Sequence, residues 1–322
     1  MNDLFTQIAL MDRMPLTFNA LVVEYTSRCP AKCAMCYQSA GPKGSDIIGS
    51  ATGGEAFLDQ GMLLRLIAFA RDNGFATLST TTNGYWAATP ARADAVCAAA
   101  WAAGLTGMEI SWDHWHRPYV DAAAVNNCLE ACARHGIAAN LRILSTKPHS
   151  YHEALSLLRP DALACAQTIT CAPVHPTGRA GAEIAPEDIH DQGTLDDTCH
   201  SILNLTVNAR GDVSPCCAGL DQLSGHSFGN AGREDIGAIA ARLNASPIIR
   251  TLVFRGVLHL RALLKDAGLD PGTGFTGICH MCWSIFSDPA AVRAIEDAYA
   301  RRRRMALVAA MARLGAPEPA EA

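Results

Sequence analysis

Residues 29–36 read Cys29-Pro-Ala-Lys-Cys33-Ala-Met-Cys36 and directly follow an apolar, β-branched run over 20–25. Three cysteines on one short loop can bind three irons of a cubane cluster and leave the fourth iron without a protein ligand. Structural zinc is the alternative, but such sites close with four ligands, and no fourth cysteine or histidine completes this loop. The loop therefore favours an iron–sulfur cluster whose open iron can take a chelating substrate.

The residues after this loop alternate between strand-like and helical patterns. Strand-like runs recur about every 30 residues, the spacing of repeated βα units. They lie at 47–52, 77–82, 108–112, 140–144 and 168–171. The helical patterns between them have readable ends: one closes at Gly74, one begins at Thr89-Pro90 and closes at Gly104, and one covers 121–135. This alternation predicts an α/β fold with a parallel sheet and right-handed crossovers.

Composition and charge exclude several classes of protein. With 322 residues, 49% of them hydrophobic and 18% charged, the chain exceeds one typical domain and can bury a large core. A net charge of −5 offers no basic surface for nucleic acid or an anionic membrane, and no apolar run has the length of a membrane helix. Residues 1–15 lack the features of a secretory signal, so we expect a cytoplasmic protein. The odd total of 13 cysteines then favours reduced thiols and metal ligation over disulfides.

Polar or glycine-rich residues follow each predicted strand. The carboxyl ends of parallel strands meet at one edge of a sheet, and α/β enzymes place their active sites there. The groups expected at this edge are Gly53-Gly54-Glu55, Thr82-Asn83-Gly84, Ser111-Trp112-Asp113, Arg142 to Ser145 and 173–179.

The spacing Cys29-x3-Cys33-x2-Cys36 after a first strand resembles the signature of the radical S-adenosylmethionine (SAM) superfamily, and the later motifs follow the family's order over about residues 20–180. The resemblance implies a partial (β/α)6 TIM-like barrel and a 4Fe-4S cluster whose open iron chelates SAM. It also implies which residues contact SAM: Gly53, Gly54 and Glu55 at the amino group, Ser111 and Asp113 at the ribose or carboxylate, Met35 at adenine, and Thr82, Asn83, Arg142 and Arg179 elsewhere in the site.

Three residues near the strand ends are candidates for catalysis. Cys171 ends a strand and can donate a hydrogen atom to a substrate radical, although ordinary burial is the alternative. Asp113 and His116 lie in a loop where a substrate can stack or be hydrogen-bonded, with packing as the alternative, and the loop also carries Trp112, His114 and Trp115. His175 is a further candidate for contacts to SAM or substrate. Three other cysteines occupy apolar helical positions and are predicted to be core residues, namely Cys97, Cys128 and Cys132.

The second half carries a second set of cysteines. Alternating residues over 203–207, a turn at 208–212 and a return through Val213 predict a β-hairpin framed by cysteines. Helical patterns cover 233–244, 247–254, 257–268 and 289–314, and a glycine-rich loop precedes the Cys-x2-Cys pair. Four thiolates in this half can together hold either a 4Fe-4S cluster or zinc. They are those of Cys199, Cys216 (or Cys217 in its place), Cys279 and Cys282.

The spacing Cys199-x11-Gly211-x4-Cys216, followed by Phe228-Gly-Asn, resembles the twitch or SPASM auxiliary-cluster domain of radical SAM enzymes. The resemblance favours iron–sulfur over zinc and Cys216 over Cys217, and it implies one auxiliary 4Fe-4S cluster because no cysteine follows Cys282. The expected divisions are a radical SAM core over 1–185, a small α+β auxiliary-cluster domain over 186–288, and a helix and tail over 289–322.

The resemblance implies an enzyme that reductively cleaves SAM to a 5′-deoxyadenosyl radical and abstracts hydrogen from a substrate. The favoured substrate is a ribosomally synthesised peptide that is cross-linked, oxidised or epimerised. The alternatives are a dehydrogenase or epimerase of a small molecule such as an amino sugar, and a zinc or iron–sulfur regulatory protein without activity. The expected partners are an electron donor such as flavodoxin or ferredoxin and a separate leader-binding protein, since the cluster motif begins at residue 29.

Two segments depart from simple expectations. Only ten residues, 37–46, separate Cys36 from the next strand-like run, so the first crossover helix is expected to be short or absent. This leaves open how the barrel begins. Arg301 to Arg304 lie in a helical pattern and are expected to form a solvated surface, and the tail from Pro317 is expected to be disordered.

Overall fold

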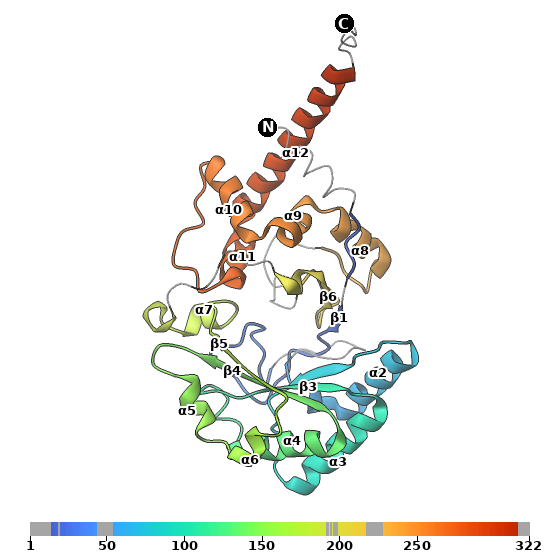
Figure 1. The fold of residues 1–322 in the computed structure, drawn as a ribbon, viewed down its shortest axis with the longest axis vertical. Helices are drawn as coiled ribbons and strands as arrows, with labels where there is room; N and C mark the ends of the chain where they lie inside the picture. The colour runs from blue at the N-terminus through green and yellow to red at the C-terminus, as the bar shows by residue number, and fades with distance from the viewer. Residues whose placement is uncertain are drawn as a thin grey trace, which may run out of the picture.

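The computed structural model describes residues 14–18, 20–43, 54–190, 193, 195, 199–216 and 228–314. Figure 1 shows the first half of the chain as a sheet backed by helices and the second half as a helical layer beside it. Four features predicted from the sequence lie outside the described residues, namely the strand at 47–52, Gly53, Cys217 and the tail from Pro317.

The central element of the first half is a parallel four-stranded sheet in the order β2-β3-β4-β5. Its strands are β2 (Ser79–Thr82), β3 (Gly107–Ser111), β4 (Ala138–Ser145) and β5 (Thr168–Pro173), and the connecting helices are α2 (Gln60–Asp72), α3 (Pro90–Ala103) and α4 (Ala122–His135). Shorter elements are the 3-10 turn at Ala56–Asp59 and the helices α5 (Tyr151–Leu155), α6 (Pro160–Leu163) and α7 (Ala180–Glu183). The predicted α/β class with a parallel sheet is confirmed.

The predicted helix ends are present and have the expected chemistry. The hydroxyl of Thr89 accepts a hydrogen bond from the backbone N–H of Arg92 and caps α3. Gly104 and Gly136 end α3 and α4 in left-handed conformations, with φ of 115° and 71°.

The three cysteines predicted to be core residues, Cys97, Cys128 and Cys132, are fully buried between these helices and the sheet. Cys128 and Cys132 each lie 3.7 Å from the sulfur of Met108 on β3. The prediction that they fill the core is confirmed.

The first strand, β1 (Ala20–Val23), pairs with a segment far along the sequence. It runs parallel to β6 (Asn204–Val207), and β6 is antiparallel to β7 (Val213–Ser214), so the predicted hairpin is confirmed. The described strands therefore form two sheets, and the strand that precedes the cysteine loop joins the hairpin assigned by sequence to the second domain. Sequence patterns do not reveal this pairing because it brings together residues about 180 positions apart.

The connection after the cysteine loop contains no helix in its described part, 37–43. This agrees with the expected shortness of the first crossover.

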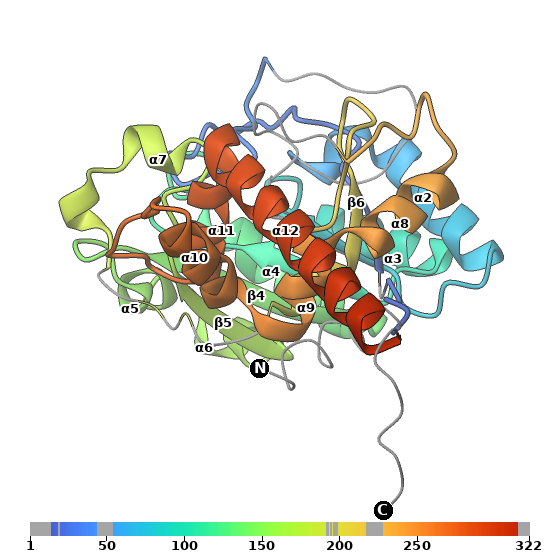
Figure 2. The same cartoon turned by 90° about the horizontal axis from the view of Figure 1, so that it is seen from above.

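The second half is mainly helical. Two 3-10 turns, Pro186–Asp188 and His200–Leu203, precede α8 (Ile236–Ala245), α9 (Pro247–Arg255), α10 (Val257–Asp266), α11 (Ile278–Ser287) and α12 (Pro289–Leu314). Figure 2 shows α12 lying across α9, α10 and α11, with which it shares a second hydrophobic core. Sequence patterns do not predict α11, because a Cys-x2-Cys pair after a glycine-rich stretch is typical of a metal-binding loop.

The arginines 301, 303 and 304 are exposed, as predicted. No helix of the described ranges is long and apolar enough to cross a membrane.

Candidate functional site

A cavity of about 1250 Å³ separates one face of the parallel sheet from the second half of the chain. Its lining includes residues of β1, β2, β3 and β4, together with the start of α11. All seven described cysteines that were predicted as metal ligands line this one cavity: Cys29, Cys33, Cys36, Cys199, Cys216, Cys279 and Cys282. The fold therefore brings two distant sets of thiols to one space.

The first three thiols converge in a buried loop. Burial raises the pKa of the Cys29 thiol to about 12, and the negative charges of Glu55 and Cys36 add to this shift. Burial likewise raises the pKa of Cys33 and of Cys36, because a thiolate is poorly solvated in a space removed from water. Without a metal these thiols are protonated at neutral pH, so cluster binding must displace their protons.

Arg179 braces the cysteine loop. Its Nη1 donates a hydrogen bond of 2.8 Å to the carbonyl of Cys33, its Nη2 donates to the carbonyl of Ala40, and its backbone N–H donates to the carbonyl of Cys36 at 3.0 Å. The preceding Gly178 has φ of +56°, and a Cβ there would lie 1.9 Å from the carbonyl oxygen of Tyr37. The structure thus gives Arg179 a role in shaping the loop, and its predicted contact with SAM stays a prediction.

Glu55 joins the glycine motif to the end of β2. Its carboxylate accepts hydrogen bonds from the hydroxyl of Thr82 at 2.7 Å and from the backbone N–H of Asn83 at 2.8 Å. The residue is 1% exposed, and this burial raises the pKa of Glu55 although the hydrogen bonds oppose the shift. The amide nitrogen of Asn83 in turn lies 3.7 Å from the sulfur of Cys29. Two motifs separated by 28 residues therefore meet beside the first thiols.

Gly54 allows the closest approach between the glycine motif and the cysteine loop. It has φ of +59°, and a Cβ added there would lie 2.2 Å from the carbonyl oxygen of Arg28, which accepts a hydrogen bond from the backbone N–H of Glu55. Gln38 connects the same region, since its side chain accepts from the backbone N–H of Gly54 at 3.0 Å and donates to Glu24. Sequence reasoning does not single out Gln38 and Glu24, because neither belongs to a recognisable motif. Gly53 lies outside the described residues.

We expect Gly54→Ala to lower the free energy of unfolding by more than about 2 kcal/mol, because it combines left-handed backbone strain with a clash against fixed backbone. Gly74→Ala is the matched control: Gly74 has φ of +84°, and nothing lies within 4 Å of the position that its Cβ would take, so only the strain of about 1 kcal/mol applies. Chemical denaturation of both variants measures the difference. Equal destabilisation would contradict the close approach.

Asp113 presents an unsatisfied buried oxygen at the cavity. Its Oδ1 accepts from the backbone N–H of Trp115 at 3.1 Å and lies 2.9 Å from Nδ1 of His116, whereas its Oδ2 has no partner among the described residues. The residue is 1% exposed, and its charge contributes to the raised pKa of Cys33, which places it near the first thiols. A buried carboxylate oxygen without a donor indicates a site for a ligand that supplies one, as the amino or hydroxyl groups of SAM do.

His116 is stabilised in its charged form by its neighbours. Burial alone would lower the pKa of this imidazole, but the charge and hydrogen bond of Asp113, together with the charge of Glu55, outweigh burial and raise it. Both His116 and Asp113 line the cavity. The two predicted catalytic residues of this loop are therefore brought to the site as one hydrogen-bonded pair.

The remaining predicted residues divide into two groups. Ser111 on β3 and Arg142 on β4 are register partners that line the cavity, as does the buried Met35. Cys171 on β5 pairs in register with Ile143 on β4, whereas the residues of β4 that line the cavity alternate with Ile143. Successive side chains of a strand point to opposite faces, so the structure does not bring the predicted hydrogen donor Cys171 to the cavity.

The second set of thiols comes from three segments. Cys199 precedes the 3-10 turn at 200–203, Cys216 follows β7, and Cys279 and Cys282 lie near the start of α11. Burial raises the pKa of Cys282, and the charges of Cys216, Cys199 and Cys279 raise it further, so each of these three sulfurs lies near that of Cys282. Four converging thiolates fit a 4Fe-4S cluster or a zinc ion.

His175 connects the end of β5 with the segment before α11. It follows β5 and lines the cavity, and its Nδ1 lies 2.6 Å from the hydroxyl of Thr276, two residues before α11. Gly277, next in the chain, approaches His175 so closely that a Cβ would lie 2.9 Å from Cε1. Burial lowers the pKa of His175 to about 4, so this imidazole is neutral at physiological pH.

No protein-family model matches the chain. The chain is 23% identical over 294 residues to the "Putative peptide biosynthesis protein YydG" of Bacillus subtilis (strain 168), an alignment that covers 82% of this chain and 91% of that protein.

Among solved structures, the radical S-adenosylmethionine methyltransferase TsrM from Kitasatospora setae, with cobalamin and a 4Fe-4S cluster bound, is similar with a TM-score of 0.34 and 15% identity, covering 88% of this chain and 61% of that one. A crystal structure of 2,3-dimethylmalate lyase is similar with a TM-score of 0.31 and 14% identity over 52% of this chain and 63% of that one. The chain thus spans less than two thirds of the length of either structure. The cysteine motif and the strand-end residues gathered around it support the assignment of this chain as a radical SAM enzyme.

Proposed function

We propose that this chain modifies a ribosomally synthesised peptide by radical SAM chemistry, using one 4Fe-4S cluster on Cys29, Cys33 and Cys36 and a second, auxiliary 4Fe-4S cluster. The observation that carries the proposal is the convergence of both thiol sets on one cavity, beside the Asp113 oxygen that has no partner in the described part of the chain. The auxiliary cluster would take the four remaining thiols, Cys199, Cys216, Cys279 and Cys282.

The residues around the first three thiols support SAM binding. When bound, the reduced cluster and SAM supply a 5′-deoxyadenosyl radical that abstracts hydrogen from the substrate. Asp113 would orient SAM through its Oδ2, which has no partner among the described residues, and Asn83, which lies between Glu55 and the sulfur of Cys29, would fix the edge of the SAM site. Glu55 positions this edge through the hydrogen bonds that its carboxylate accepts from Phe57, Thr82 and Asn83. Burial of these groups excludes water and stray hydrogen donors from the reacting atoms.

One observation on the cavity favours a peptide as the substrate. Its sheet face is polar, with Glu109, Asn140 and Arg142 in the lining. Arg142 lies 3.8 Å from Glu109 and Asn140 accepts a hydrogen bond from Thr168, and an extended chain would bind beside these pairs through its N–H and C=O groups. The name of the relative YydG, which refers to peptide biosynthesis, points the same way. An auxiliary cluster facing this cavity suits an oxidation, because it can accept the electron left on a substrate radical.

A flavodoxin or ferredoxin would supply the reducing electron, and a separate protein would present the leader of the peptide.

The proposal is tested by anaerobic reconstitution with iron and sulfide, followed by incubation with dithionite, SAM and short peptides encoded beside the gene for this chain. We expect 5′-deoxyadenosine together with a peptide that has lost two hydrogens or has gained deuterium from D2O. Absence of 5′-deoxyadenosine from iron-loaded protein would contradict radical SAM chemistry. Formation of 5′-deoxyadenosine coupled to consumption of an amino sugar, with every peptide unchanged, would contradict the peptide assignment alone.

We expect Asp113→Asn to weaken SAM binding by about tenfold or more, because a hydrogen bond to a charged oxygen is lost while the shape of the side chain is kept. Asp121→Asn is the matched control, since Asp121 is an exposed N-cap that makes no capping hydrogen bond at α4. Calorimetric titration of the cluster-loaded variants with SAM measures both affinities. Equal affinities would remove Asp113 from the SAM site.

A further inference from the structure

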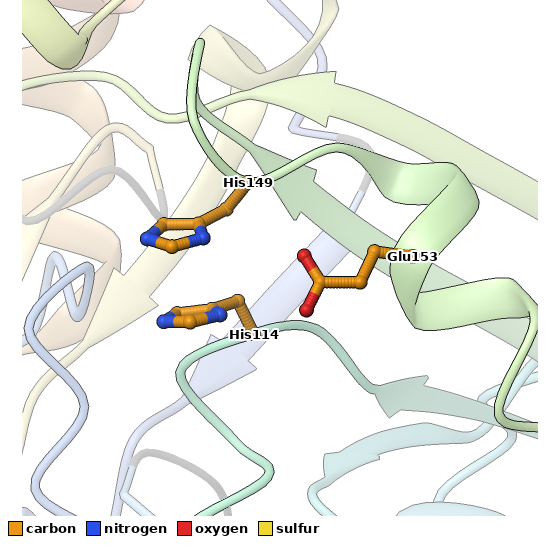
Figure 3. A group of neighbouring side chains, drawn as sticks. All are labelled: His114, His149 and Glu153. Carbon is orange, nitrogen blue, oxygen red and sulfur yellow. The ribbon is translucent and has the colours of Figure 1, made fainter.

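Two histidines and a glutamate form a separate cluster on the far side of the Asp113 loop. His114 follows β3, His149 lies between β4 and α5, and Glu153 belongs to α5. One candidate ligand atom from each side chain lies within 4.8 Å of the others, and Figure 3 shows the carboxylate facing one edge of the two imidazole rings. None of the three lines the large cavity, so neither cysteine set nor the proposed peptide chemistry explains them.

The two imidazole rings stack face to face beside Trp115. Their centroids are 3.4 Å apart with an angle of 13° between the planes, and the edge of Trp115 packs against both at 5.6 and 5.9 Å. Two charged imidazolium rings would repel each other at this separation. Nδ1 of His114 is buried and has no hydrogen-bond partner among the described residues. Burial, and then the charge of His149, lowers the pKa of His114, in agreement with a free nitrogen lone pair.

We propose that His114, His149 and Glu153 form a binding site for a divalent zinc ion, with water completing the coordination. Two imidazole nitrogens and one carboxylate oxygen are a ligand set that zinc uses in proteins. The Nδ1 of His114, which has no partner among the described residues, lies beside a second imidazole and a carboxylate. Imidazole lone pairs lie in the ring planes, so the two stacked rings would rotate about their Cβ–Cγ bonds to direct both nitrogens at one cation. Glu153 also pairs with Arg117 through Oε1, which leaves Oε2 for the metal.

The zinc ion would join two loops of the active-site edge. His114 is adjacent to Asp113, and Trp115 packs against the loop of the first three thiols. His149 lies in the connection between β4 and α5, and Glu153 lies in α5. This segment already contacts the 112–116 loop, because the indole N–H of Trp112 donates a hydrogen bond to the carbonyl of Ala154. Metal binding therefore fixes the segment that carries Asp113 and His116, as a structural clamp outside the chemistry itself.

The test is anaerobic equilibrium dialysis of the iron-loaded enzyme against Zn²⁺, with zinc and iron measured by mass spectrometry. For the wild type we expect one bound zinc per chain in addition to any zinc at the cysteines. In both His149→Asn and Glu153→Gln we expect the zinc affinity to fall about tenfold or more while the iron content stays unchanged. His152→Asn is the matched control, because His152 is exposed on the same helix and stacks on Tyr151. Glu153→Gln changes an exposed side chain, so it tests the site without disturbing the core.

X-ray absorption at the zinc edge separates this site from the cysteines. We expect nitrogen and oxygen ligands at about 2.0–2.1 Å and no sulfur. Zinc bound only through sulfur, or equal zinc affinity in the wild type and in the His149→Asn and Glu153→Gln variants, would overturn the proposal. Because both readouts measure metal and not turnover, they stand or fall independently of the radical SAM assignment.

Discussion

Replacing Cys29, Cys33 and Cys36 together with alanine is expected to abolish formation of 5′-deoxyadenosine from SAM under anaerobic, reducing conditions. The three thiols are the ligands proposed for the cluster, and the described loop offers no substitute: Ser27, Gln38 and Ser39 carry oxygen or amide groups, which are poor ligands for this cluster. The same variant is expected to lose about half of its iron. Chromatographic detection of 5′-deoxyadenosine, with iron analysis of the same sample, measures both effects.

Cys165→Ala is the matched control for this experiment. Cys165 is half-buried after the end of α6, donates to the carbonyl of Asp161 and lies outside both thiol sets. Its replacement should leave SAM cleavage and iron content unchanged. Undiminished 5′-deoxyadenosine from the triple variant would refute the assignment of the first cluster.

The second large effect concerns the auxiliary site. Cys279→Ala is expected to remove about half of the iron while SAM cleavage continues without coupling to substrate, because the variant breaks only the second set of four thiols. Cys282 is half-buried and lies near Cys216 and Cys199. Loss of Cys279 leaves one iron of the auxiliary cluster without the thiolate that closes it. Iron analysis and Mössbauer spectra of the variant and the wild type would measure the loss, and 5′-deoxyadenosine would report the first cluster.

The identity of the metal is decided by the same samples. About eight irons per chain are expected for two 4Fe-4S clusters, with any zinc confined to nitrogen and oxygen ligands. Full retention of iron in Cys279→Ala would exclude that cysteine as a ligand. Zinc in place of iron at both thiol sets would favour the regulatory protein that lacks activity.

Much of the first half follows from local chemistry. The capping hydroxyl of Thr89 and the left-handed glycines at 104 and 136 act over a few residues, so sequence patterns place the helix ends correctly. The helix α11 escapes such patterns because its cysteines and glycine-rich approach resemble a metal-binding loop, whereas apolar contacts to α10 and α12 hold it as a helix. Packing of this kind overrides local propensity and is not visible in one segment.

By itself the sequence determined the α/β class, the parallel strands within 79–173, the hairpin and the seven cysteines that face the cavity, because periodicity, caps and ligand spacing depend on near neighbours. Only the tertiary structure decided that β1 pairs with β6, that Arg179 braces the cysteine loop and that Cys171 faces away from the cavity. It also decided that Asp113 keeps one oxygen unpartnered among the described residues and that His114 meets His149 and Glu153. These features depend on strand register and long-range packing, in which a shift of one residue reverses the face of every side chain.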